Sequence, residues 1–459
     1  ADLQYNWAEG PVMCKRNGFY YYFVAGSVAG GEYVLRTRTL TSDSARWERL
    51  GNFFEPITDP NTGFRGPNHI AAPIKLADGS WWTIAQSYER YKGSDWTGTG
   101  RQTSLYRVIW KGNRPWGMEP VSTPVIRPDL PSSGILWRSV HSDYFDHDSL
   151  NVCWHFLDRK AARSYSLSAR KGWIQLIPDS GRTHLLQKET DHYYSAVTKV
   201  DLNADNVADK AGLYLTNGNQ SVTVQLYSGY DNGEKMIVFK LDTAIREAPN
   251  KIGKVVWLKI ERKAHALTGY YSSDGNNWNV LGAPISAVSL DKEQPNFNSW
   301  VGTSVGLFAQ GKPAYFDFFI CKDGFSSLPA VGYRNYFGIA TVQQASEKVV
   351  TNTSGYGGWF VISGVDLGKN ERIARQVEVL ASSTKGGKLE IWLDGLMNNG
   401  KWIATITIKP TGDQGNFKVF RGKIKPVSGH HDVFVKFPPA DAGGIYIKSI
   451  QFLNGETKR

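Results

Sequence analysis

The strongest constraint on the fold is a pattern of short aromatic and β-branched runs that repeats through almost the whole chain. Typical runs are Phe19–Phe23, Val222–Leu226 and Val433–Phe437, and glycine, asparagine or aspartate residues separate each run from the next. Apolar runs of this length between turn residues are typical of strands, and a sustained helical periodicity is hard to find beside them. The sequence therefore predicts an all-β chain.

Length and composition fit several packed β-domains. The chain has 459 residues, of which 13% are aromatic, 41% hydrophobic and 21% charged. These values exclude a disordered chain, a collagen and a coiled coil. No stretch approaches the roughly 18 apolar residues that a membrane helix needs, so no membrane span is expected.

The distribution of charge argues against a nucleic-acid partner, and the spacing of the cysteines argues against disulfides. The formal net charge is +11, but the cations lie singly along strands such as Lys254–Lys259, with no basic run of five residues. We therefore expect a generally basic surface and no nucleic-acid partner. Cys14, Cys153 and Cys321 are far apart and form no CxxC pair, so buried free thiols are expected.

Composition divides the chain into three zones, which we predict to be domains at 1–131, 143–325 and 333–455. In the first zone, the turn dipeptide Asn17-Gly18 precedes an aromatic strand, and Asp78-Gly79 does so again roughly 60 residues later. This spacing suits one propeller blade each, and two blades fall short of the about four to eight that close a propeller. A proline-rich hinge at 120–131 follows, and the other two zones have the size of β-sandwiches.

The segment Trp7-Ala8-Glu9-Gly10-Pro11 is the most informative for chemistry. A carboxylate beside Gly-Pro at a strand end can be held rigidly, and aromatic walls would desolvate it and favour its protonated form, as a general acid requires. A capping or turn glutamate is the alternative. Sequence spacing by itself does not separate the two.

Several segments resemble glycoside hydrolase family 43, whose catalytic domain is a five-bladed propeller. Ala8–Pro11 together with Lys15–Tyr21 resembles its general-acid segment, and three further stretches follow in the family's order. Residues 143–325 resemble the concanavalin-like sandwich that often follows this domain, and 333–453 resemble a family 6 carbohydrate-binding module. The resemblance implies a partial five-bladed β-propeller followed by two jelly-roll β-sandwiches. The three further stretches are Gly66–His69, Asp78–Trp82 and Gly100–Tyr106.

Residue by residue, the resemblance assigns Glu9 as the general acid that protonates the leaving sugar oxygen. It places Arg101, His69 and Trp82 at the sugar site, where a guanidinium fork suits paired hydroxyls and His69 would bind water or a central cation. A surface arginine, a structural histidine and a tryptophan in the blade core are the respective alternatives. No residue is assigned as a metal ligand.

An inverting glycosidase also needs a general base, with the two carboxyls about 6.5–9.5 Å apart. In the family, the base and a second aspartate that tunes the acid precede the Glu-Gly-Pro segment, but only eight residues precede Glu9 here. We therefore expect both aspartates outside this chain, in a missing N-terminal half of the propeller.

In the last zone, the resemblance points to Tyr356, Asn416 and Phe417 as glycan contacts. No cofactor is expected for catalysis, and a structural calcium is the one ion the resemblance leaves open. The expected function is a secreted or periplasmic inverting hydrolase that binds arabinoxylan or xylo-oligosaccharides and releases α-L-arabinofuranosyl units. A β-xylosidase and a non-catalytic glycan-binding fragment are the alternatives.

Overall fold

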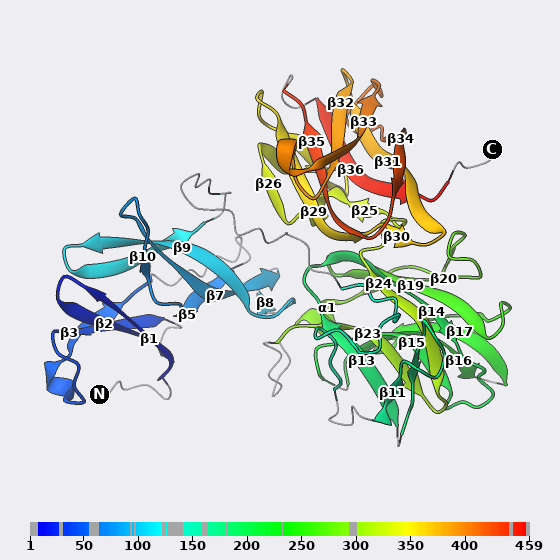
Figure 1. Cartoon of the computed structure of the whole chain (residues 1–459), viewed down its shortest axis with the longest axis horizontal. Coiled ribbons are helices and arrows are strands. Elements are labelled where there is room, and N and C mark those ends of the chain that lie inside the picture. The colour runs from blue at the N-terminus through cyan, green and yellow to red at the C-terminus, as the bar shows by residue number, and fades with distance from the viewer. Residues whose placement is uncertain are drawn as a thin grey trace. The chain divides into compact units, whose positions relative to one another are not determined.

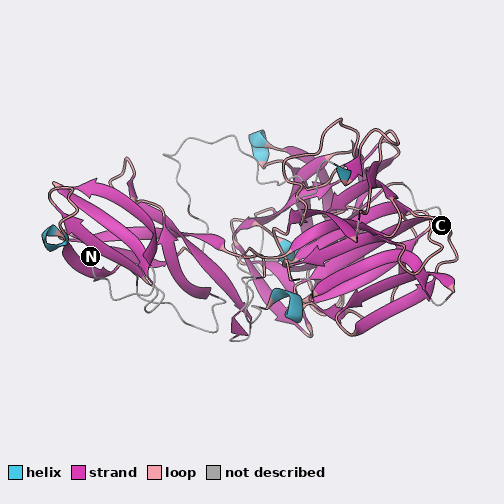
Figure 2. Ribbon diagram, turned by 90° about the horizontal axis from the view of Figure 1, so that it is seen from below, coloured by secondary structure: helices cyan, strands magenta, loops and turns pink. Residues whose placement is uncertain are grey.

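Strands dominate the molecule (Figure 2), which confirms the predicted all-β class. In the computed structural model the backbone alone is described for 64–67, 88–91 and 94–95. The structure describes residues 8–26, 31–54, 64–91, 94–95, 98–121, 125, 141–157, 163–179, 181–219, 221–231, 233–292, 301–439 and 444–455.

The chain forms two compact units. The first contains 1–127 and 291–303, and the second contains 128–290 and 304–459. Most of the predicted hinge at 120–131 lies outside the described residues. Of the stretch that groups with the first unit from later in the chain, residues 291–292 and 301–303 are described.

The first unit consists of two antiparallel sheets, drawn blue to cyan in Figure 1. In each sheet the main strands follow one another in sequence order, which is the meander of a propeller blade. The first sheet contains β1 (Ala8–Arg16), β2 (Phe19–Gly26), β3 (Glu32–Thr37) and β4 (Glu48–Asn52). The second contains β5 (Phe64–Ile70), β7 (Trp81–Tyr91), β9 (Gln102–Lys111) and β10 (Arg114–Pro120), with the short β6 (Ile74–Lys75) and β8 (Ser94–Asp95).

Both predicted turns are present. Asn17 and Gly18 have φ of 50° and 75° and connect β1 to β2, as a two-residue hairpin with positive φ at both positions requires. Gly79 has φ of 85°, and the Asp78 carboxylate accepts a hydrogen bond from the Ser80 amide. Aromatic side chains from both sheets then pack into one core that includes Tyr21, Phe23, Phe53, Phe54 and Tyr106.

The second unit begins with a two-sheet sandwich whose core lies between its sheets. One sheet contains β11 (Tyr165–Ser166), β12 (Ile174–Leu176), β14 (Tyr193–Asp201), β19 (Val255–Lys263), β20 (Ala266–Ser272), β21 (Asn279–Val280), β22 (Ile285–Ser286) and β24 (Ala314–Cys321). The other contains β13 (Arg182–Lys188), β15 (Lys210–Thr216), β16 (Thr223–Asp231), β17 (Glu234–Leu241), β18 (Ala244–Pro249) and β23 (Ser304–Gln310). The short helix α1 (Val288–Asp291) follows β22.

A second sandwich, hereafter the terminal module, completes this unit with its own core. One sheet contains β25 (Leu328–Pro329), β27 (Ile339–Gln344), β28 (Glu347–Asn352), β30 (Gly368–Lys369), β31 (Arg372–Ser383), β34 (Lys418–Val427) and β36 (Ile445–Leu453). The other contains β26 (Asn335–Phe337), β29 (Gly358–Asp366), β32 (Gly387–Leu393), β33 (Lys401–Ile408) and β35 (His430–Phe437).

The helices and the cysteines bear on two expectations from the sequence. In the described part of the chain, no helix has the length and apolar character to cross a membrane. The three cysteines are free, as predicted, but each is partly exposed and not fully buried.

Candidate active site

The first sheet places Glu9 against a histidine from the second sheet. The Glu9 Oε1 atom lies 3.1 Å from Nε2 of His69. Burial lowers the pKa of His69, the Arg101 guanidinium lowers it further, and the Glu9 carboxylate opposes both. With its pKa lowered, His69 is neutral near pH 7, so its contact with Glu9 is a hydrogen bond and not an ion pair.

The structure explains why position 10, in the Glu-Gly-Pro segment, is occupied by glycine. Gly10 lies at a bulge between β1 and β2, and its φ of +63° is a value that side-chain-bearing residues rarely adopt. A Cβ atom at Gly10 would lie 2.5 Å from Nδ1 of His69. The absence of a side chain at position 10 thus leaves the space that the His69 ring occupies beside Glu9.

We predict that Gly10→Ala destabilises the first unit by about 1–3 kcal/mol, because it adds backbone strain and displaces the His69 ring. Gly112→Ala is the matched control, since Gly112 has φ of +61° but a Cβ atom at that position would meet nothing within 4 Å. Chemical denaturation and the NMR signals of the His69 imidazole measure the two effects. A His69 signal that moves equally in both variants would contradict the steric explanation.

A buried carboxyl group that sequence analysis missed supports the backbone of His69. Glu32 is fully buried, and its Oε2 accepts a hydrogen bond of 2.9 Å from the His69 amide. His69 has φ of 52°, a conformation that residues other than glycine seldom adopt. The hydrogen bond to Glu32 helps to hold the backbone of His69 in it. Burial raises the pKa of Glu32 to about 8, although the amides of His69 and Ile70 act in the opposite direction.

This pKa predicts how Glu32 affects stability. Between about pH 4.5 and pH 8 the folded protein keeps the Glu32 proton that the unfolded chain loses. Its contribution is therefore fully present below this window and is lost as the pH rises through about 8. The wild-type chain should lose on the order of 4 kcal/mol of unfolding free energy between pH 5 and 9, and we expect Glu32→Gln to abolish this loss, as measured by chemical denaturation across that range. Glu119→Gln, at an exposed position, should leave that slope intact, and an unchanged slope in Glu32→Gln would refute the assignment.

Arg101 belongs to the same site, because its positive charge helps to lower the pKa of His69. The residue before it, Gly100, has φ of +84°, and a Cβ atom there would lie 2.7 Å from the backbone of Val301. The Thr303 amide donates to the Gly98 carbonyl at 3.1 Å, so residues 301–303 pack directly beside the segment that carries Arg101. Glu9 and His69 thus lie in contact, and Arg101 is close enough to His69 to influence its charge. The roles of the three residues at a sugar site stay a prediction.

Trp82 lies elsewhere on the second sheet. Its indole donates a 2.8 Å hydrogen bond to the Ser80 hydroxyl in the turn before β7, and its backbone pairs with Ile74. None of its described contacts reaches Glu9, His69 or Arg101. A role of Trp82 in sugar binding therefore stays a prediction.

The enclosure expected around Glu9 is not seen in the described part of the first unit. The Glu9 side chain is 55% exposed, so aromatic rings of the described residues do not enclose it. The side chain is instead oriented by His69. This arrangement leaves the carboxyl accessible to a molecule that approaches from outside.

The terminal module carries a polar and aromatic surface that sequence analysis also missed. Leu389, Ile391 and Leu393 of β32 point into the core, so the alternate residues Glu390 and Trp392 point outward. We name this outward surface the aromatic face. It comprises Phe337, Trp359, Glu390, Trp392, Trp402, Phe434 and Lys436.

Contacts within the aromatic face fix its polar groups. The Glu390 carboxylate accepts hydrogen bonds of 2.9 Å from both the Trp392 indole and the Lys436 ammonium group. Trp402 pairs with Trp392 across the strands and is 56% exposed. Exposed rings beside ordered polar groups are suited to bind a sugar, whose faces are apolar and whose edges are polar. The signal in the sequence was the alternation in Glu390–Leu393, which shows which side chains leave the core.

The predicted glycan contacts of the module lie on loops. Tyr356 is 93% exposed, and Asn416 donates a 2.6 Å hydrogen bond to the Thr411 carbonyl. Phe417 lies under Lys448, with 5.9 Å from Nζ to the ring centre. The module also has a cavity of about 310 Å³, and none of the three residues lines it; its walls include Asn352, Lys385, Lys388 and Phe437.

Family models match three successive parts of the chain. Residues 1–115 match glycosyl hydrolases family 43, 142–322 match the beta xylosidase C-terminal concanavalin A-like domain, and 329–454 match the family 6 carbohydrate binding module.

Individual proteins agree with these matches. The chain is 23% identical over 342 residues to the non-reducing end alpha-L-arabinofuranosidase BoGH43B of Bacteroides ovatus, covering 68% of this chain and 62% of that protein. It is 24% identical over 328 residues to a xylosidase/arabinosidase of Butyrivibrio fibrisolvens, covering 66% and 61%. The matched part thus spans less than two thirds of the length of either relative. The structure of xylan beta-1,4-xylosidase from Bacillus halodurans C-125 matches with a TM-score of 0.60 at 20% identity, covering 69% of this chain and 65% of that one.

The two blade-like sheets and the two sandwiches together define a multidomain, all-β chain. More specifically, three successive segments match the models of glycosyl hydrolases family 43, the beta xylosidase C-terminal concanavalin A-like domain and the family 6 carbohydrate binding module, in that order. The resemblance found in the sequence is confirmed, and the fold is a partial propeller with two β-sandwiches.

Proposed function

We propose that this chain is part of an inverting glycoside hydrolase that acts on arabinoxylan-type hemicellulose. The observation that carries the proposal is the Glu9–His69 contact beside Arg101. In this function the Glu9 carboxyl donates its proton to the oxygen of the leaving sugar, and neutral His69 holds the carboxyl in one orientation. Arg101 binds hydroxyl groups of the sugar through its guanidinium fork.

The second carboxylate of the reaction, the general base, is proposed to come from outside the chain. Glu32 does not suit that role, because it is fully buried and bound to the His69 amide. A base needs direct access to the water it activates, with the carboxyls about 6.5–9.5 Å apart. The reaction itself requires no cofactor. Secretion or a periplasmic location fits a polymer substrate, and a structural calcium remains part of the proposal.

We propose α-L-arabinofuranosyl units as the sugar released. The Bacteroides ovatus relative is named as an arabinofuranosidase, whereas the Bacillus halodurans structure is named as a xylosidase, so a β-xylosidase is the second candidate. Hydrolysis of nitrophenyl α-L-arabinofuranoside and nitrophenyl β-xyloside by the protein that contains this chain tests the choice. Turnover of neither substrate, with xylan binding retained, would leave a glycan-binding protein and refute the hydrolase.

We further propose that the aromatic face binds xylan-type polysaccharide. Trp402→Ala should weaken xylan binding about tenfold, because the exposed ring supplies a stacking surface. Tyr356→Ala is the discriminating variant, and affinity electrophoresis in xylan-containing gels measures both. If Tyr356→Ala weakens binding and Trp402→Ala does not, the binding surface is the loop around Tyr356.

A further inference from the structure

A cavity of about 430 Å³ lies where the concanavalin-like sandwich meets the terminal module, within the second unit. We name it the junction pocket. Its volume falls in the range of about 300–1,000 Å³ that is typical of small-molecule sites, which occur preferentially between domains. Neither the proposed hydrolase site nor the aromatic face contributes a residue to it.

The two domains each supply one wall. Tyr193 and Lys263, which pair across β14 and β19, form the wall from the first sandwich. Glu347, Lys348 and Lys448 form the wall from the terminal module. The segment that connects the two domains, which includes Pro329 and Gly332, lies between these walls. Pro329 of β25 pairs with Ser449 of β36, and a Cβ atom at Gly332 would touch Tyr193.

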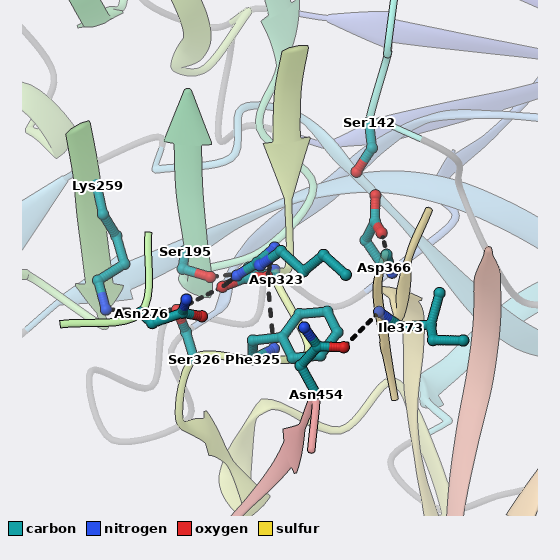
Figure 3. A network of polar contacts seen from close by, with 12 residues as sticks. Ser142, Ser195, Lys259, Asn276, Asp323, Phe325, Ser326, Asp366, Ile373 and Asn454 are labelled. Atoms are coloured by element: carbon teal, nitrogen blue, oxygen red, sulfur yellow. Dashed lines mark hydrogen bonds and ion pairs between the residues drawn. The ribbon is translucent and has the colours of Figure 1, made fainter. Parts of the chain in front are cut away.

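A network of buried polar contacts fixes the walls relative to each other. Figure 3 shows Asp323 at its centre, beside Ser195 and Ser326. The Asp323 carboxylate, 1% exposed, binds the Arg372 guanidinium of the module through both oxygens, at 3.0 and 3.2 Å. The Tyr144 hydroxyl of the first sandwich donates a 2.9 Å hydrogen bond to buried Asp366 of the module. The pocket is thus formed before any ligand binds.

The charges of the pocket favour an anion. Three lysines line it, against Glu347 as its single carboxylate. Glu347 pairs with Lys448, and Lys263 is 3.9 Å from Glu261, which lies closer to Lys259. Lys348 is exposed and has no carboxylate partner among the described residues. The lining of the pocket therefore carries an excess of positive charge.

The remaining lining is apolar. Pro329, Val331 and Leu380 line the pocket together with the Tyr193 side chain. Apolar lining residues with an aromatic ring suit the face of a pyranose, and ammonium groups in the same lining suit a carboxylate on that ring. We propose that the junction pocket binds a carboxylate-bearing saccharide of the uronic acid class. The proposal depends on the geometry of the second unit and not on hydrolysis.

Calorimetric titration of the 459-residue chain tests this binding, with xylotriose that carries one glucuronic acid as the ligand. Neutral xylotetraose and inorganic phosphate serve as comparison ligands. We expect the acidic oligosaccharide to bind at least tenfold more tightly than either, and its binding to weaken at least tenfold in the Lys348→Gln/Lys448→Gln double variant. Lys251→Gln, at an exposed lysine of the same unit that does not line the pocket, is the control and should bind as the unchanged chain does.

Each other outcome overturns the proposal. Equal binding of xylotetraose would show that the carboxylate is not recognised, and equal binding of phosphate would show a site for anions in general. If the double variant still binds the acidic sugar, the binding site lies outside the junction pocket. The same titration with Trp402→Ala then shows whether that site is the aromatic face. Circular dichroism of the double variant establishes that it is folded.

Discussion

Replacing Glu9 with glutamine in the proposed hydrolase should lower kcat/KM for arabinoxylan by about 10²–10⁴-fold, the range typical of a lost general acid. Glutamine keeps the size of the side chain and a hydrogen bond to His69, but it has no proton to give to the leaving oxygen. The measurement is the initial rate of arabinose or xylose release from the polymer. Stability should change little, because Glu9 is half exposed.

Glu119→Gln provides the control for this experiment, since Glu119 is an exposed carboxylate of the same unit. Its rate should equal that of the unchanged enzyme. A Glu9→Gln variant that retains full activity would remove Glu9 from the reaction. A variant that loses its fold would indicate that Glu9 is a turn residue, which is the alternative the sequence left open.

The second large effect concerns the joint between the two sandwiches. We expect Asp323→Ala to destabilise the second unit by about 3–5 kcal/mol, because it leaves the Arg372 guanidinium buried without its counter-charge. Ser326 and the Phe325 amide would lose their acceptor at the same time. Chemical denaturation followed by tryptophan fluorescence measures the change, and we expect the sandwich and the module to unfold separately in the variant.

An exposed ion pair serves as the comparison. Lys312 and Asp205 form a contact between partly exposed side chains in the same unit, so Asp205→Ala should change stability little. An Asp323→Ala variant that unfolds in one transition at the same denaturant concentration as the unchanged chain would show that the joint does not couple the domains.

Local chemistry explains why much of the fold was predictable from sequence. Turn dipeptides such as Asn17-Gly18 specify a hairpin by themselves, and strand alternation follows from burial of one face. The location of Glu9 at a strand end beside Gly10 could be predicted for the same reason. The residues that surround it come from distant segments, and only the family resemblance pointed to His69 and Arg101.

Long-range contacts account for what the sequence did not reveal. Glu32 has a role only because it is buried against the backbone of His69, 37 residues further along the chain. Nothing local to Val301 and Gly302 indicates that they pack beside Gly100, about 200 residues earlier in the chain. The aromatic face requires strand register, since Trp392 and Trp402 become neighbours only through the pairing of β32 with β33.

The most direct test of the account compares Glu9→Gln on two substrates that differ in their leaving groups. A natural arabinoxylo-oligosaccharide needs a proton on the oxygen that leaves with the xylan chain, whereas a dinitrophenyl α-L-arabinofuranoside has a leaving group that departs without one. The account predicts a loss of kcat/KM of several powers of ten on the natural substrate and a much smaller loss on the dinitrophenyl glycoside. Equal losses on both substrates would contradict it.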